Sequence, residues 1–168
     1  MSLMEEDRQY IANTYGRFPL EAASGKNATC VDGDGRAYID FSSGIGVNSL
    51  GFCDDGWAAA VARQAAALQH ISNLYYTAPM VKVAKVLCER TFADKVFFCN
   101  SGAEANEGMI KTARKYSFDK YGKGRHRILA LENSFHGRTV TTLSATGQEV
   151  FHRYFDPFTD GFSFVEAG

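Results

Sequence analysis

Apolar residues recur at helical spacing in several stretches of the chain. In residues 55–71, DGWAAAVARQAAALQHI, apolar positions fall three or four residues apart, at Trp57, Val61, Ala65, Leu68 and Ile71. The alanines between them also favour a helix. A second helix is predicted from about Pro79 to Arg90, with three inward residues, Val83, Leu87 and Cys88. Residues 5–13 are consistent with the start of a short helix.

The spacing of the apolar residues changes after residue 94. Apolar runs at 95–100 (KVFFCN), 126–132 (HRILALE) and 161–168 (GFSFVEAG) predict strands, the first two of them buried. Helices are predicted between them at 102–121 and, less strongly because of its threonines, at 139–147 (TVTTLSATG). Continuous apolar strands that alternate with helices favour an α/β architecture with a largely parallel sheet.

Residues 18–41 have the pattern of short strands and turns. ATCVDGDGRAYIDF, residues 28–41, predicts a hairpin with Asp-Gly turn chemistry between two strand-forming runs. Asp32 and Asp34 resemble the start of a calcium loop, but Arg36 stands at the fifth position and no glutamate follows at the twelfth. We therefore predict a turn there and no metal site.

Composition narrows the function classes. The 168 residues are 45% hydrophobic with a net charge of -1, which excludes a strongly basic nucleic-acid binder and gives no sign of disorder. No apolar stretch is long enough to cross a bilayer, and the acidic start lacks the apolar region of a signal peptide, so we expect a cytoplasmic protein. The four cysteines form no CxxC pair, which argues against zinc or a disulfide framework; Cys88 and Cys99 are expected to be buried.

NSGAEANE, residues 100–107, lies where a predicted strand turns into a predicted helix. One interpretation is an ordinary capping box, with Ser101 as the N-cap and Glu104 three residues on. The other is an anion site, because Gly102 and Ala103 are small and would let a phosphate approach the first-turn N–H groups and the positive end of the helix dipole. The motif matches neither a dinucleotide fingerprint nor a Walker-type loop.

ENSFHGRT, residues 132–139, follows the next predicted strand in the same way. If consecutive βα units are neighbours, both motifs lie on one rim of the sheet. Phe135 could cover an aromatic ring, His136 could donate a hydrogen bond, and Arg138 offers a planar fork for a carboxylate. The alternative is a turn in which Phe135 packs on the core and Arg138 pairs with a surface acid. Together the two motifs favour a phosphorylated aromatic cofactor beside a carboxylate substrate.

Five linked stretches resemble a known family. TYGRFPL, DFSSGIGVNSLG, SNLYYT, FFCNSGAEANEGMIKTARKY and SFHGRTVTTLSATG are together similar to the N-terminal part of the class III pyridoxal-phosphate (PLP) aminotransferases, nearest to their acetylornithine aminotransferase branch. The resemblance implies fold type I, a large domain around a mostly parallel sheet and a smaller domain built from both chain ends. Residues 1–52 would contribute to the small domain and 53–168 would begin the large one. It also implies a homodimer with its sites at the interface.

The resemblance assigns roles to particular residues. Ser101, Gly102 and Ala103 would hold the PLP phosphate, and Phe135 and His136 would also contact the cofactor, Phe135 by stacking on the pyridine ring. The substrate would be bound by three residues, Arg138 at its α-carboxylate, Tyr15 in the pocket wall and Asn73 near the site or subunit boundary. The implied reaction moves an amino group from N-acetylornithine, or a related ω-amino acid, to 2-oxoglutarate in arginine biosynthesis.

This sequence departs from the family pattern mainly at the residues that the family uses for catalysis. The family's Schiff-base lysine and the aspartate that pairs with the pyridine nitrogen lie well downstream, and neither Lys95 nor Lys111 sits in a matching motif. We therefore expect the chain to be an N-terminal portion that is inactive alone. In GFCDDG, residues 51–56, the family usually has His and Pro.

Several alternatives remain open at this stage. The chain could be a truncated, non-catalytic interaction module that pairs through SNLYYT, or an ornithine, succinylornithine or 4-aminobutyrate aminotransferase. A further alternative is another phosphate-ligand enzyme on a similar α/β frame.

Overall fold

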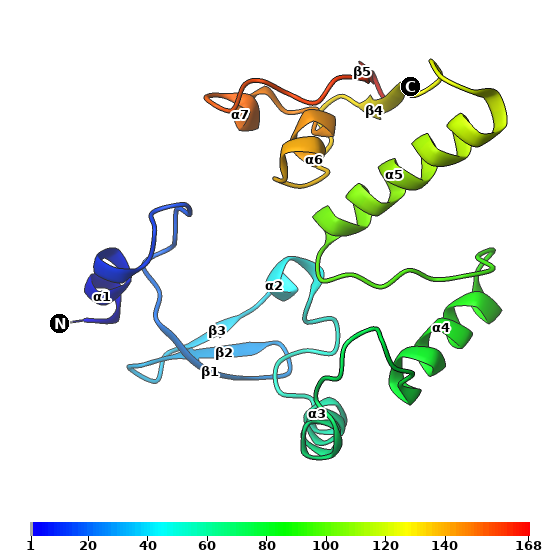
Figure 1. The fold of residues 1–168 in the computed structure, drawn as a ribbon. Helices are drawn as coiled ribbons and strands as arrows, with labels where there is room; N and C mark the ends of the chain where they lie inside the picture. Colours follow the sequence, from blue (N-terminus) through cyan, green and yellow to red (C-terminus); the bar gives the residue numbers. More distant parts are fainter. Residues whose placement is uncertain (1) are drawn as a thin grey trace. The chain divides into compact units, whose positions relative to one another are not determined.

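The computed structural model describes residues 2–168, which form two compact units. One unit ends at Tyr76 and the other begins at Thr77. These units reflect compactness within this chain, whereas the predicted boundary at residues 52 and 53 concerns domains of a larger protein, so that boundary stays a prediction. Figure 1 gives the order of the elements, and each unit is described by itself.

The first unit holds a small sheet, two short helices and a longer helix. Its elements are α1 (Leu3–Tyr10), β1 (Ala22–Lys26), β2 (Thr29–Asp32), β3 (Ala37–Ile39), α2 (Ser43–Gly46) and α3 (Asp55–Ala67). The three strands form one antiparallel sheet in the order β1-β2-β3 (Figure 1). In β2 and β3, Thr29 pairs with Ile39 and Val31 with Ala37. The predicted hairpin is therefore confirmed.

Asp32 organises the turn of that hairpin. Its Oδ1 accepts hydrogen bonds from the backbone N–H of Arg36 at 2.8 Å and of Asp34 at 3.0 Å. The Tyr38 hydroxyl donates to Oδ2 at 2.9 Å. These bonds favour the carboxylate, above all the backbone bond from Arg36, and hold the pKa of Asp32 below its ordinary value. The aspartates that resemble a calcium loop thus serve the turn itself.

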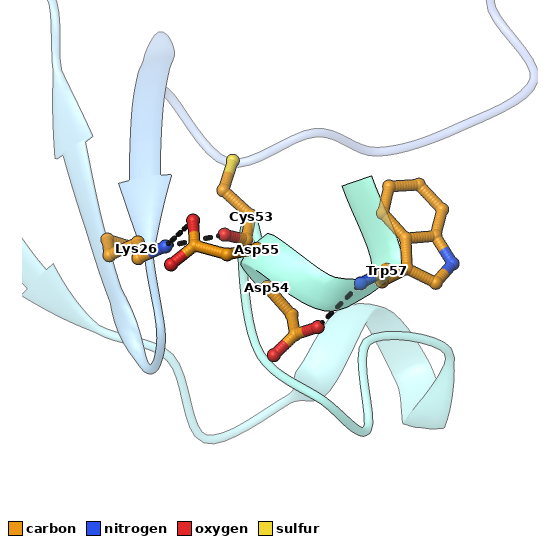
Figure 2. A network of polar contacts seen from close by, with 5 residues as sticks. All are labelled: Lys26, Cys53, Asp54, Asp55 and Trp57. Carbon is orange, nitrogen blue, oxygen red and sulfur yellow. Dashed lines mark hydrogen bonds and ion pairs between the residues drawn. The ribbon is translucent and has the colours of Figure 1, made fainter. Parts of the chain in front are cut away.

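A lysine joins the sheet to the start of α3. Figure 2 shows Lys26 Nζ donating to the carbonyl oxygen of Cys53 and to Oδ1 of Asp55, both at 2.7 Å. Beside it, Asp54 caps α3 by accepting from Trp57 N at 2.7 Å. The bond to Asp55 raises the pKa of Lys26. The predicted helix at 55–71 is confirmed as far as Ala67, the last residue of α3.

The second unit contains a parallel strand pair whose connection is helical. Its elements are α4 (Ala78–Arg90), α5 (Gly102–Tyr121), β4 (Ile128–Leu131), α6 (Val140–Ala145), α7 (Glu149–His152) and β5 (Phe162–Val165). Strands β4 and β5 pair in parallel from Ile128↔Phe162 to Leu131↔Val165, and α6 and α7 lie in the crossover between them (Figure 1). This is a βαβ arrangement of the kind the apolar pattern predicts. The burial predicted for the strand at 126–132 is wrong except at Ala130, because Leu129 and Leu131 are exposed.

A small core holds this second unit together. Its buried apolar side chains come from α5, β4 and α6, at Ile110, Ala130, Leu143 and Ala145. Three hydroxyl residues are buried with them, Thr142, Ser144 and Thr146. Helix α5 has the range predicted from the sequence, and it ends before Gly122, whose φ of +77° suits glycine.

The predicted buried strand at residues 95–100 is wrong. The segment is not a strand, and Phe97 and Phe98 are 74% and 39% exposed. Cys99 is exposed as well, contrary to its expected burial, and Cys88 is only partly covered. A strand needs a neighbour that accepts its backbone hydrogen bonds, and no described strand pairs with this run. The Phe97 ring lies instead against Gly108 of α5, where an added Cβ would be 3.1 Å from it.

The inward face predicted for α4 is only partly correct. The helix itself is confirmed, with a proline in its first turn. Val83 and Leu87, however, are 50% and 40% exposed. Their spacing specifies a helix with one apolar face, but it does not specify which element covers that face.

Candidate functional site

Ser101 caps α5 as predicted. Its Oγ accepts from the backbone N–H of Glu104 at 3.2 Å. The Glu104 carboxylate does not complete the capping box on Ser101 N; it accepts from Asn100 N, one residue earlier, at 2.7 Å. The cap therefore occupies the N–H groups of Asn100 and Glu104.

The first-turn amides between these two residues remain available. Within residues 2–168, no hydrogen bond engages the N–H groups of Gly102 and Ala103. The space beside Gly102 is open, because an added Cβ would meet no atom within 4 Å. These amides begin a helix of 20 residues, whose dipole favours an anion at this end. The capping and anion-binding interpretations of this motif are thus compatible.

The loop after β4 packs directly on this end of α5. A Cβ at Gly137 would lie 2.8 Å from the Ala103 Cβ and 2.6 Å from Thr142 Oγ1. Asn106 Nδ2 donates to the carbonyl oxygen of His136 at 2.8 Å. The φ of Gly137 is +126°, so both its conformation and its surroundings require glycine. The two motifs that the sequence places after successive apolar runs lie side by side.

Two buried threonines hold the backbone of that loop. Thr146 Oγ1 accepts from His136 N at 3.0 Å and lies 3.2 Å and 3.0 Å from the carbonyl oxygens of Gly137 and Thr142. Thr142 Oγ1 accepts from Thr139 N at 3.1 Å. Both threonines are fully buried. Sequence reasoning treated the threonines at 139–147 as a weakness of the helix; their hydroxyl groups are what fixes the loop.

Phe135 and Arg138 lie together at the surface of this loop. The Phe135 ring is 53% exposed and meets the Phe151 ring edge-on, with centroids 5.6 Å apart. The Arg138 Cζ lies 5.7 Å from the Phe135 centroid and 5.4 Å from that of Phe151. The alternative in which these residues form only a turn required Phe135 to pack into the core. Phe135 does not do so. Phe151 was missed from the sequence because it stands in no recognisable motif.

The two remaining predicted site residues, Tyr15 and Asn73, lie in the first unit. Tyr15 is 59% exposed and lines an open cleft of about 730 Å³, whose other lining residues also lie between Leu3 and Ala22. Arg17 lies over its ring at 5.8 Å and forms an ion pair with Asp7 at 3.2 Å. Asn73 is exposed in the turn after α3. The roles of both residues stay predictions.

The donor set at the start of α5 and its neighbouring loop suits a phosphorylated aromatic molecule. Free first-turn amides and the open space at Gly102 suit a phosphate, and the exposed face of Phe135 suits a flat ring. Across residues 2–168, no group of three or more His, Cys, Asp or Glu side chains is arranged to hold a metal ion. In the same range no helix has the length and apolarity needed to cross a membrane.

Comparison with known sequences agrees with this chemistry. The sequence profile of the family described as "Aminotransferase class-III" matches residues 10–168, nearly the whole chain. The chain belongs to the class-III aminotransferase family. Acetylornithine aminotransferase from Haemophilus ducreyi is 55% identical over 161 residues, which are 96% of this chain and 41% of the relative. The enzyme of the same name from Methanocaldococcus jannaschii is 46% identical, over 95% of this chain and 40% of the relative.

Solved structures place the fold in the same family. The ornithine aminotransferase from Toxoplasma gondii superposes with a TM-score of 0.91 at 30% identity, over 97% of this chain and 39% of that one. An omega transaminase from Pseudomonas jessenii, solved in complex with PMP, gives 0.88 at 30% identity over 99% and 39%. The fold is part of the α/β fold type I of PLP-dependent transaminases, as the motifs predicted. The chain spans about 40% of the length of the relatives it matches.

Proposed function

We propose that this chain supplies the cofactor-phosphate site and the substrate-carboxylate site of a PLP-dependent aminotransferase. The observation that carries the proposal is the contact of Gly137 with Ala103, which brings the phosphate-binding amides of α5 beside the loop that bears Phe135 and Arg138. Family membership and the 55% identity to an acetylornithine aminotransferase support the same reaction.

Each predicted site residue of the second unit has a physical task in this proposal. The N–H groups of Gly102 and Ala103, with the Ser101 hydroxyl, bind the phosphate at the positive end of α5. Phe135 covers one face of the pyridine ring and keeps water from it, while His136 lines the cofactor side of the loop. When bound, PLP supplies an electron sink for the substrate bond that is broken. Arg138 binds the substrate carboxylate through its planar fork and so orients the amino-bearing carbon.

The proposed donor is N-acetylornithine and the acceptor 2-oxoglutarate, which would place the protein in arginine biosynthesis. Both molecules carry a carboxylate that suits Arg138, and Tyr15 and Asn73 would complete the substrate site. We further propose a cytoplasmic homodimer with its sites at the subunit boundary. Residues 1–52 would belong to a small domain and residues 53–168 to the large one.

A separate part of the proposal concerns covalent attachment. None of the lysines of this chain, Lys95 and Lys111 included, lies in the motif of the family's reactive lysine. We therefore expect the 168-residue chain to bind PLP reversibly and not to turn over substrate by itself. Equilibrium dialysis with PLP, followed by an assay for glutamate formed from N-acetylornithine and 2-oxoglutarate, separates binding from turnover.

The phosphate site is tested by filling it. In Gly102→Val the new side chain has space in the fold but occupies the position that a phosphate would take. We expect PLP affinity to fall at least ten-fold, while the affinity for pyridoxal, which lacks the phosphate, changes little. Gly33→Val, also in open space, is the matched control. Unchanged PLP affinity in Gly102→Val would contradict the proposed site.

A further inference from the structure

Arg138, Phe135 and Phe151 form one cluster, which we call the guanidinium cluster. The Arg138 Cζ lies within 6 Å of both ring centroids, at 5.7 Å from Phe135 and 5.4 Å from Phe151. The two rings meet edge-on at an interplanar angle of 63°. Phe135 and Arg138 are exposed, whereas Phe151 is partly covered. Two members of the cluster are thus accessible from solvent, and the third is only partly so.

We propose that Phe151 is a positioning residue that holds the Arg138 guanidinium beside Phe135, ready for a substrate carboxylate. This inference rests on the proposed function, because it assigns Arg138 a carboxylate partner. A guanidinium is attracted electrostatically to the face of an aromatic ring. Contact with two rings restricts the Arg138 side chain, so less conformational freedom is lost when the ligand binds. Phe151 touches neither substrate nor cofactor in this role; it acts through Arg138.

The segment that carries Phe151 is anchored at several points, which gives the ring a fixed place. We call residues 148–159 the support segment. Gln148 Nε2 donates to the Ser134 carbonyl oxygen at 3.3 Å, and Thr159 N donates to Ser144 Oγ at 2.8 Å. Between these ends, His152 Nε2 lies 3.0 Å from the Leu143 carbonyl oxygen and donates to it.

These anchors attach the support segment to α6 and to the Phe135 loop, and not to Arg138 itself. The His152 ring also packs on Phe158, with centroids 4.9 Å apart. The backbone around Phe151 is therefore held independently of its ring, so the ring can be changed while its support remains.

The competing explanation is that Phe151 only packs as an apolar side chain. Replacing its ring separates this role from the positioning role. Phe151→Leu keeps an apolar side chain of comparable size but removes the aromatic face, whereas Phe151→Tyr keeps that face. Phe158→Leu is the matched control, because it removes a ring from the same segment that contacts His152. Should Phe151→Leu not fold, Phe151→Met takes its place.

The first measurement is the proton resonance of the Arg138 side chain in protein expressed from its own gene with labelled arginine. The signal is assigned by its disappearance in Arg138→Lys. Protons over a ring face are shifted upfield by the ring current, so we expect the shift to be reduced in Phe151→Leu and retained in Phe151→Tyr and Phe158→Leu. An Arg138 signal that is the same in Phe151→Leu as in the parent overturns the positioning role.

The second measurement is calorimetric binding of glutarate, a dicarboxylate that cannot be transaminated, with and without PLP. We expect affinity about two- to five-fold weaker in Phe151→Leu, restored in Phe151→Tyr. Equal affinity in Phe151→Leu and the parent, or an equal loss in Phe158→Leu, overturns the inference. A parent protein that does not bind PLP defeats the proposed function instead, and the resonance measurement, which needs no cofactor, still decides the role of Phe151.

Discussion

Helices α3 and α6 differ in a way that their sequences do not suggest. Helix α3 is rich in alanine and carries Trp57 and Val61, yet none of its 13 residues is buried, and those two are 59% and 48% exposed. Helix α6, VTTLSA, is shorter and more polar, and four of its six residues are buried. The more hydrophobic helix is the more exposed one.

The difference shows that burial depends on neighbouring elements as much as on hydrophobicity. Helix α6 lies in the crossover between the paired strands β4 and β5, against α5 and α7. The hydroxyl groups of Thr142 and Ser144 can be buried because Thr142 accepts from the loop backbone and Ser144 accepts from the support segment. Helix α3 is specified locally, by its alanines and by the Asp54 cap.

The strongest test of this contrast truncates one apolar residue in each helix. Leu143→Ala, at a position only 7% exposed, is expected to lower the free energy of unfolding of the 168-residue chain by about 2–5 kcal/mol. Val61→Ala in α3 should change it by less than about 0.5 kcal/mol. Urea unfolding of both variants measures the difference. Equal losses would mean that α3 is packed in solution against a partner that the described fold does not show.

Disturbing the close contact between the Phe135 loop and α5 is expected to cause the next largest loss of stability. Gly137→Ala should cost about 1–3 kcal/mol through its positive φ, with a further overpacking cost of about 1–3 kcal/mol against Ala103 and Thr142. The matched control is Gly124→Ala, which has a φ of +111° but no atom within 4 Å of the new Cβ. Its loss in thermal or urea unfolding should be clearly smaller.

Removing the buried hydroxyl of Thr146 is expected to lower the free energy of unfolding nearly as much as Gly137→Ala does. Thr146→Val keeps the shape but leaves the His136 N–H without its acceptor, which should cost about 1–3 kcal/mol in urea unfolding. Thr146→Ser keeps the hydroxyl and should lose less. If the valine variant were as stable as the parent, the loop would not depend on this hydrogen bond.

The smallest expected effect concerns the exposed hairpin turn in the first unit. The pKa of Asp32 is below its ordinary 3.8 in the folded chain, so its contribution is present above pH 3.8 and is lost as the pH falls through the lower folded value. Asp32→Asn should therefore flatten the acid limb of a stability-against-pH curve. Tyr38→Phe, which removes one of the three bonds to Asp32, should flatten it partly. An unchanged acid limb in both variants would show that the ionisation of Asp32 adds nothing to stability.

The sequence predicts local structure well where a helix is specified within its own residues. The range 102–121 of α5, its Ser101 cap and the hairpin at 28–41 all follow from local pattern. The strand expected at 95–100 fails because pairing depends on a second strand, and apolarity alone cannot supply one. The exposed faces of α3 and α4 reflect the same limit.

The residues of the candidate site also form two groups, those that the sequence could select and those that it could not. Ser101, Gly102, Ala103, Phe135 and Arg138 could be selected from the sequence because each follows an apolar run with a residue type suited to a ligand. Thr146 and Phe151 could not, because a threonine or a phenylalanine in an unremarkable stretch looks the same whether or not it contacts the loop. Their contribution comes from contacts across the crossover, which only the folded chain creates.

The parallel pairing of β4 with β5 also has a consequence for the order of folding. The loop with Phe135 and Arg138, the threonines beneath it and the support segment all lie between those two strands in the chain. Closing such a connection costs chain entropy before its contacts form, so non-local parallel pairs are slow to assemble. Helix α5, by contrast, is local and can form early. We therefore expect hydrogen exchange during refolding to protect the hydrogen-bonded amides of α5, from Ala105 onward, before it protects the loop with Phe135 and Arg138, so that one of the two predicted ligand-binding segments forms before the other.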